Sequence, residues 1–196
     1  MIFHQNAYRD AVSLLGIQFR QCQSFGLHRD PSHFPFNPWV CELRRRAYNH
    51  LCCLNAIAIT SYGAESSLPH TSDCPPPINA DDTDWQPHRF AKPDSVPSDS
   101  QGFKEMTFAN VHRAIADLTV EIAKRNPDDL KQKEALIRST ELSLHEKYIK
   151  YIDRSNPDQT IVAALVEVRL ESLRLTVSHR RSRLASSSAG GTESYK

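Results

Sequence analysis

Apolar residues recur at intervals of three and four along most of the chain, and this spacing predicts amphipathic helices. The pattern defines five segments, at about 7–24, 38–61, 107–124, 127–152 and from 157 onwards. In the second segment the expected buried row is Val40, Leu43, Ala47, Leu51, Leu54 and Ala58. No segment alternates apolar and polar residues as a half-buried strand does. The pattern therefore predicts an all-α fold, an irregular multi-helix domain of about five helices.

Three of the predicted helices follow an Asn-Pro pair. The pairs are Asn37-Pro38, Asn126-Pro127 and Asn156-Pro157. An asparagine side chain accepts hydrogen bonds from the free amides of a first helical turn, and proline fits the first helical position because an N–H there has no partner anyway. We therefore expect these helices to begin at the three prolines.

Between the second and third predicted helices the composition changes. Residues 66–101 hold seven of the twelve prolines and few aliphatic residues. Proline removes backbone donors and fixes φ, which favours a loop. We expect one domain over 1–185 that contains this Pro-rich loop, followed by a disordered tail over 186–196, where serine, glycine and charged residues predominate.

Charge and cysteine content narrow the classes of function. Lys and Arg number 24 against 23 acidic residues, so the basic excess typical of nucleic-acid-binding domains is missing and no direct nucleic acid contact is expected. The odd count of five cysteines without a C-x-x-C pair is typical of reduced thiols in an intracellular protein. No leader is expected, and no apolar stretch of the length of a membrane span occurs.

Consecutive arginines at Arg44, Arg45 and Arg46 raise the question of an anion or nucleic acid site. On a helix they point about 100° apart, so they cannot form one stripe along a phosphate backbone. The simpler interpretation is a charged helix rim with ion pairs to Glu42 or to a distant acid. A second basic group, HRRSR at 179–183, suits a helix C-terminus, with a nuclear-import patch as the alternative.

Metal and catalytic motifs are incomplete. His50 and Cys53 are three residues apart and could share a zinc ion, but no second pair with ligand spacing exists. The DDTD acids at 81–84 lie in the Pro-rich loop, where they are expected to cap a turn or the next helix instead of holding magnesium. His28-Arg29-Asp30 lacks the other parts of a kinase site. We expect no catalytic residue, no metal site and no cofactor.

Five segments in order carry a resemblance to a known family. They read FGLHRDPSHF, PWVCELRRRAYNHLCCLNA, SYGAESSL, PPPINADDTDW and GFKEMTF. Their order and spacing resemble the fungal-specific transcription factor domain, the middle homology region of binuclear zinc-cluster regulators. The matching positions, expected to have structural or interaction roles, are Gly26, Leu27, His28, Arg29, Asp30, Glu42, Arg44, Arg45, Arg46, Asn79, Asp82, Asp84, Gly102, Phe103, Glu105 and Met106.

The sequence also departs from this family pattern. Ala47, Tyr48 and Asn49 stand where the family has Leu-Trp-Trp, Asn55 stands in place of Asp, and Lys104 in place of Thr. No run of six clustered cysteines occurs, so the zinc-cluster DNA-binding module is expected to be absent.

The resemblance implies a nuclear protein in transcription control, with a fungal secondary-metabolite gene cluster as its expected setting. Without the DNA-binding module it would act through protein partners, either a DNA-binding transcription factor or a second copy of itself, and not at a membrane. One alternative is a recruited helical scaffold that binds a small molecule or acts as an enzyme, with a pocket lined by His28, Arg44, Tyr48 and His50. Another is a remnant that does not fold alone, which a broad thermal transition would reveal.

Overall fold

The described part of the chain is built from helices. The computed structural model describes residues 2–69, 71–86, 96–126 and 128–189, and for 2–9 and 179–189 only the helical backbone. The helices are α1 (Ile2–Ser24), α2 (Pro38–Tyr62), α3 (Asp82–Trp85), α4 (Thr107–Lys124), α5 (Leu130–Lys147) and α6 (Pro157–Ala189), with 3₁₀ turns at Pro31–His33 and Ile149–Tyr151. No strand occurs among these residues, which confirms the all-α prediction.

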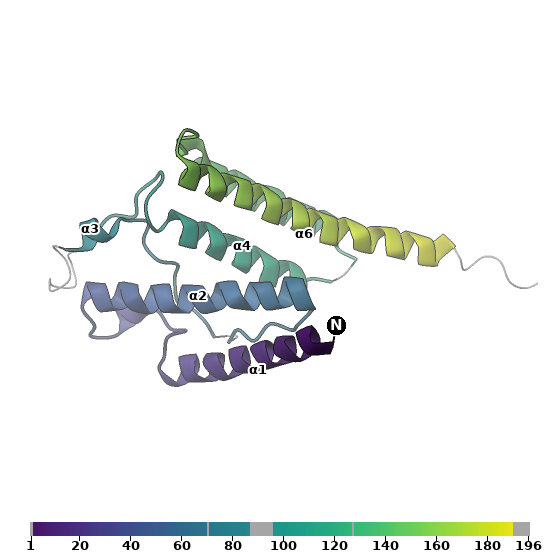
Figure 1. The fold of residues 1–196 in the computed structure, drawn as a ribbon, viewed down its shortest axis with the longest axis horizontal. Coiled ribbons are helices and arrows are strands. Elements are labelled where there is room, and N and C mark those ends of the chain that lie inside the picture. Colours follow the sequence, from purple (N-terminus) through teal and green to yellow (C-terminus); the bar gives the residue numbers. More distant parts are fainter. Residues whose placement is uncertain (1, 70, 87–95, 127, 190–196) are drawn as a thin grey trace, which may run out of the picture.

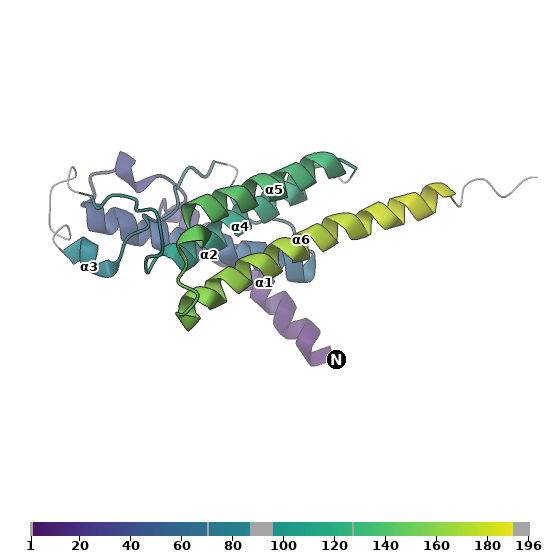
Figure 2. The same ribbon diagram turned by 90° about the horizontal axis from the view of Figure 1, so that it is seen from above.

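Helix α2 lies at the centre of the arrangement. It packs against α1 on one side and against α4 on the other, and α5 and α6 cover the far side of α4 (Figure 1). Seen from above, α5 and α6 run beside one another, and the C-terminal part of α6 extends past the other helices (Figure 2). None of the helices in the described ranges combines the length and apolar character that a membrane crossing needs.

Two apolar cores lie on opposite sides of the contact between α2 and α4. The first core joins α1, α2 and the start of the Pro-rich loop, and consists of Leu15, Phe19, Cys22, Tyr48, Cys52, Ala58 and Cys74. The second core joins α4, α5 and α6, and consists of Val111, Ile115, Leu118, Ile122, Ile137, Leu144, Tyr148, Val162, Val166, Leu170, Leu173 and Val177.

The contact between α2 and α4 contains buried polar side chains, and it corrects the expected buried row of α2. Leu43 is 45% exposed and Ala47 is exposed, whereas Tyr48 and Asn49 are buried. The Asn49 side-chain amide donates to the backbone oxygen of Ala109 on α4 at 3.3 Å. The buried face of α2 includes polar residues with partners on other elements. Apolar spacing alone therefore predicted a buried face that is rotated about the helix axis relative to the observed one.

Two of the three Asn-Pro pairs begin a helix as expected. The Asn37 Oδ1 atom accepts from the Val40 amide at 2.8 Å at the start of α2. The Asn156 Oδ1 atom accepts from the Asp158 amide at 3.0 Å at the start of α6. In these two helices asparagine therefore satisfies a first-turn amide.

The prediction for α5 is wrong at both ends. This helix begins at Leu130, with Asp129 as its N-cap accepting from the Gln132 amide at 3.3 Å, while Asn126 closes a preceding turn. Aspartate caps as well as asparagine does, so the later residue sets the start. At the other end α5 stops at Lys147, and a 3₁₀ turn follows where we expected continued helix to 152. Pro127 itself lies outside the described residues.

The first residues of the segment predicted as a tail belong to a helix. Helix α6 continues to Ala189, so residues 186–189 are helical, because serine costs a helix only a few tenths of a kcal/mol relative to better formers. Residues 190–196 lie outside the described part. Within the predicted loop at 66–101, the one-turn helix α3 is present and the other described residues are irregular.

Candidate functional site

The three consecutive arginines make separate contacts. Arg44 donates from Nη2 to the Phe25 backbone oxygen at 2.6 Å and lies over the Phe36 ring at 4.7 Å. Arg45 approaches Asp30, with 3.5 Å between Nη2 and Oδ1. All three arginine side chains are partly buried. These contacts attach α2 to the segment that follows α1, and the arginines do not form a common anion site.

Arg46 and Glu42 connect α2 to the Pro-rich loop. Arg46 donates from Nε to Glu42 Oε1 at 2.9 Å and from Nη1 to Asp82 Oδ1 at 2.8 Å, and its guanidinium lies over Trp39. Glu42 is fully buried, and its Oε2 accepts from the Ile78 amide at 3.3 Å. Burial raises the pKa of Glu42, against the opposing effect of Arg46. The expected ion pair of the arginines with Glu42 and a distant acid is confirmed at Arg46.

The Gly-Leu-His motif forms the turn after α1. Gly26 has a φ of 64°, in the left-handed region that favours glycine. Leu27 packs against the first core. The His28 backbone oxygen accepts from the amides of Asp73 and Cys74 at 3.1 and 3.2 Å. The backbone of His28 therefore holds the turn after α1 against the loop segment that contains Asp73 and Cys74.

Arg29 and Asp30 extend the contact with this loop segment. The Arg29 Nε atom donates to Asp73 Oδ1 at 3.0 Å, and the Asp30 amide donates to the same oxygen at 2.8 Å. Asp30 itself caps the turn that follows by accepting from the Ser32 amide at 2.9 Å. The interpretation of His28-Arg29-Asp30 as a local turn is therefore confirmed.

Asn79 is the most completely bonded motif residue. Its side-chain amide donates to the backbone oxygens of Ser100 and Gly102 at 2.8 and 2.9 Å, and its Oδ1 accepts from Thr107 at 3.0 Å. Its backbone amide donates to Asp99 at 2.8 Å. Asn79 therefore joins the middle of the Pro-rich loop to its C-terminal end and to the start of α4.

We expect Asn79→Ala to destabilise the protein by about 2–3 kcal/mol, because the Ser100 backbone oxygen loses its partner, and the Gly102 oxygen and the Thr107 hydroxyl keep only their own bond at 3.3 Å. Urea unfolding followed by circular dichroism measures this loss. Asn126→Ala, which removes only an exposed turn contact, is the control and should cost less than about 1 kcal/mol. Equal losses in the two variants would contradict the role given to Asn79.

The DDTD acids bind amides and a lysine. Asp81 accepts from Lys104 Nζ at 2.7 Å and from the Glu105 amide at 2.9 Å, while its own amide donates to Asp84 at 3.0 Å. The Asp82 amide donates to Glu105 at 2.6 Å. The capping role expected for these acids is confirmed, and Lys104, which departs from the family pattern, forms ion pairs with Asp81 and Asp84.

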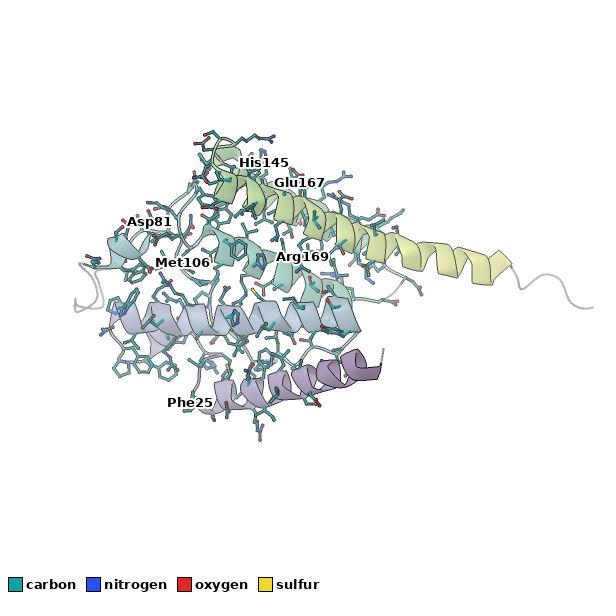
Figure 3. The ribbon with its side chains drawn as sticks, in the orientation of Figure 1. Phe25, Asp81, Met106, His145, Glu167 and Arg169 are labelled. Carbon is teal, nitrogen blue, oxygen red and sulfur yellow. The ribbon has the colours of Figure 1, made fainter. Side chains whose placement is uncertain are left out.

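Figure 3 shows Asp81 beside α3 and Met106 at the start of α4, so the contacts of this group lie where the two helices begin. Met106 is the N-cap residue of α4, and Phe103 packs against the second core. Gly102 has a φ of 96°, and its amide donates to the Lys147 backbone oxygen at 3.1 Å. The motif residues of this region thus bring the loop, α4 and the end of α5 together.

The cysteines of α2 and of the Pro-rich loop lie in different environments. Burial raises the pKa of Cys52 and of Cys74 to about 12, so both thiols stay protonated at neutral pH. Cys53 is half-buried and His50 is exposed. Among the described residues, no three His, Cys, Asp or Glu side chains are placed to share a metal ion.

The pocket suggested by the sequence is not formed. The Tyr48 hydroxyl donates to Ser72 Oγ at 2.6 Å inside the first core, Arg44 extends to Phe25, and His50 faces solvent. Tyr48, Arg44 and His50 therefore do not meet around a common space.

His112 and Arg169 instead line a small pocket between α2, α4 and α6, with a volume of about 30 Å³. A wider groove of about 1090 Å³ shares Thr60, Thr119, Ser172 and Leu173 with this pocket, but His112 is not among the residues that line the groove. The His112 ring lies 4.4 Å from that of Phe108, centroid to centroid, and its Nε2 is buried without a partner. Burial, with a contribution from Arg169, lowers the pKa of His112. Figure 3 shows Arg169 on α6.

The lowered pKa of His112 predicts acid sensitivity. Because the unfolded chain binds a proton at His112 more readily than the folded protein does, stability should fall as the pH drops through about 6.5, the unfolded value. His112→Gln should reduce the difference in urea midpoint between about pH 7.5 and about pH 5.5. The control His145→Gln changes an exposed histidine and should leave that difference unchanged. An undiminished difference in His112→Gln would contradict this prediction.

Reasoning from the sequence missed two buried polar residues of α4. Asn110 and Arg113 are buried, and Arg113 lies over the Tyr48 ring of α2, although neither residue belongs to a motif matched above. Arg113 donates from Nε to both carboxylate oxygens of Asp117 at 2.9 Å and from Nη2 to the Cys74 backbone oxygen at 3.3 Å. The only signal in the sequence was the position of both residues beside the apolar row of a predicted helix.

Comparison with known proteins finds fungal transcription regulators. The chain is 40% identical over 70 residues to "Transcription factor lepE" of Aspergillus flavus, which covers 35% of this chain and 8% of that protein. It is 27% identical over 175 residues to "Aurofusarin cluster transcription factor aurR2" of Gibberella zeae, covering 85% and 26% of the two chains. It is 29% identical over 155 residues to "Transcriptional regulator AacuB" of Aspergillus aculeatus, covering 74% and 21%.

The similarity concerns a limited part of these proteins. The chain spans about a quarter or less of the length of each of the three relatives. No family model matches the chain, and no solved structure matches it. The similarity is therefore to regulators of transcription, and it covers most of this chain in two of the three cases.

Proposed function

We propose that this chain regulates transcription in the nucleus of a fungal cell, within a secondary-metabolite gene cluster, and that it acts through protein partners. The observation that supports this most is its similarity, over most of its length, to two fungal proteins named as transcription regulators. One of these names refers to the aurofusarin cluster, and for this reason we propose a secondary-metabolite gene cluster as the target of regulation.

The contacts of the motif residues support a scaffold more than a catalyst. Arg44, Arg46, Glu42 and Asn79 bind other parts of the same chain. The buried thiols of Cys52 and Cys74 are protonated, and no activated nucleophile with a base occurs among the residues described above. Such a scaffold contributes shape and surface, which suits binding to another macromolecule.

Helix α6 presents a surface for such a partner. Ile161, Val168 and Leu175 are each more than half exposed and follow one another at intervals of seven residues. Seven residues are close to two helical turns, so the three side chains lie along one side of α6. A row with this spacing is typical of contact with a second helix. We call these residues the α6 row and propose a helix of a DNA-bound regulator as its partner.

Recovery of the tagged chain from cross-linked chromatin of its native host tests this proposal. The chain should be recovered on promoter DNA together with a zinc-cluster protein. Val168→Glu places a charge in the α6 row and should reduce this recovery about tenfold, because a charge in a helix contact costs more than about 1.4 kcal/mol.

A matched control tests whether the effect is specific to the α6 row or follows from a charge on any exposed apolar residue. Leu142→Glu makes the same kind of change at a residue of α5 that is 61% exposed, and should leave recovery unchanged. Recovery of the chain with cytosolic enzymes alone would contradict the proposed function. Equal recovery of Val168→Glu and the unmodified chain would contradict the role of the α6 row.

A further inference from the structure

Three phenylalanines and an arginine lie together at the junction of α1 and α2. Phe25 is 69% exposed and Phe34 is 41% exposed, while Phe36 and Arg44 are half-buried. Figure 3 shows Phe25 where α1 ends, on the side of the molecule where α2 begins. We call these four residues the aromatic patch. It is separate from the α6 row, because α2 and α4 lie between α1 and α6 (Figure 1).

Arg44 connects the members of the patch. Its guanidinium lies over the Phe36 ring, with 4.7 Å between Cζ and the ring centroid, and its Nη2 donates to the Phe25 backbone oxygen at 2.6 Å. The ring centroids of Phe34 and Phe36 are 5.8 Å apart. Aromatic side chains and arginine are the residues that contribute most to the centres of protein interfaces. Their grouping on an exposed surface therefore indicates a site for another protein.

The charge of Arg44 is not compensated by an acid. Three neighbouring carboxylates already pair with other arginines, in the pairs Asp73–Arg29, Asp30–Arg45 and Glu42–Arg46. Arg44 takes part in none of the ion pairs among the described residues. Its Nη1 atom makes no hydrogen bond with a described residue and keeps access to solvent. A partner with an acidic group is therefore complementary to the patch in charge.

The partner is specified by these two properties together. The exposed rings suit apolar side chains, and Nη1 can donate a charge-assisted hydrogen bond to a carboxylate. Because the Phe36 ring and the Phe25 backbone already hold the guanidinium, little further conformational entropy is lost on binding. We propose that the aromatic patch binds a protein segment that carries acidic and apolar side chains together. The proposal does not depend on the α6 row or on the role in transcription.

Fluorescence anisotropy of labelled peptides with the full chain tests the proposal. The acidic probe is a fluorescein-labelled helical peptide of about 15 residues, in which leucine and phenylalanine form one face and glutamate the other. It should bind with a Kd below about 100 μM. The same peptide with lysine in place of every glutamate should bind at least about tenfold more weakly, because it repels the Arg44 guanidinium.

Two variants test the two parts of the patch. Phe25→Ala should weaken binding of the acidic peptide about tenfold, because it removes the most exposed ring of the patch. It leaves the bond of Arg44 to the backbone oxygen in place, so the thermal transition followed by circular dichroism should stay that of the unmodified chain. Arg44→Met should weaken binding about tenfold and reduce its dependence on salt between about 50 and about 300 mM.

Controls on α5 separate the patch from exposed residues in general. Leu142→Ala and Arg138→Met remove an exposed apolar side chain and an exposed guanidinium, and both should leave binding unchanged. Absence of binding of the acidic peptide at about 1 mM would overturn the proposal, as would equal affinity for the two peptides or equal weakening by the α5 controls. Sedimentation of the chain alone provides a further test. A dimer that Phe25→Ala dissociates would mean that a second copy covers the patch, and would also overturn the proposal.

Discussion

Replacing Trp85 with alanine is expected to destabilise the protein by about 3–5 kcal/mol, the range for removing a large buried aromatic side chain. Trp85 is 0% exposed and lies 5.6 Å from Trp39, centroid to centroid. It belongs to α3, which has a single turn and cannot hold its place by its own backbone hydrogen bonds. The loss of Trp85 should therefore release α3 from the start of α2.

Urea unfolding followed by circular dichroism measures the effect of Trp85→Ala. Phe25→Ala is the matched control, since Phe25 is also aromatic but 69% exposed, and it should cost less than about 0.5 kcal/mol. A loss below about 1 kcal/mol in Trp85→Ala would show that the loop does not depend on this contact.

Replacing Glu42 with alanine should cost a similar amount, about 3–5 kcal/mol, because it removes one partner of a buried ion pair. Arg46 would keep only Asp82, whose carboxylate is more than half exposed, and the Ile78 amide would lose its acceptor. The loss should appear as a lower urea midpoint and as faster proteolysis between Ile78 and Trp85.

The isosteric variant separates the charge of Glu42 from its hydrogen bonds. Glu42→Gln keeps an oxygen for Arg46 or Ile78, and because burial raises the pKa of Glu42, removing the charge also removes a desolvation cost. Glu42→Gln should therefore lose less than half of what Glu42→Ala loses. Equal losses would mean that the charge is essential and that its burial is fully compensated.

The sequence predicted most of the helices, because their apolar spacing and caps are local properties. The predicted segments 38–61 and 107–124 correspond closely to α2 and α4. The buried face of α2 could not be predicted in the same way. Asn55, for example, is buried because Ser66 and Ser67 bond to its side chain, and these partners lie beyond the end of the helix.

The same limit applies to the candidate site. Ion pairs for the consecutive arginines and a capping role for the loop acids followed from charge and helix geometry. The use of the Phe25 backbone oxygen by Arg44, and the unpaired atoms of Asn110, depend on how α2 and α4 face other segments. Arg44 and Phe25 are 19 residues apart in the sequence, and local patterns carry no information about contacts over such a separation.

The positions of the cysteine thiols allow local opening of this protein to be followed by their reaction rates. Cys22, Cys52 and Cys74 all lie in the first core, and the second core contains no cysteine. The rate at which an alkylating reagent modifies these three side chains therefore follows the opening of the first core, including its contact with Arg113 of α4. Half-buried Cys53 lines the pocket between α2, α4 and α6, so its rate in the same reaction follows opening on that side.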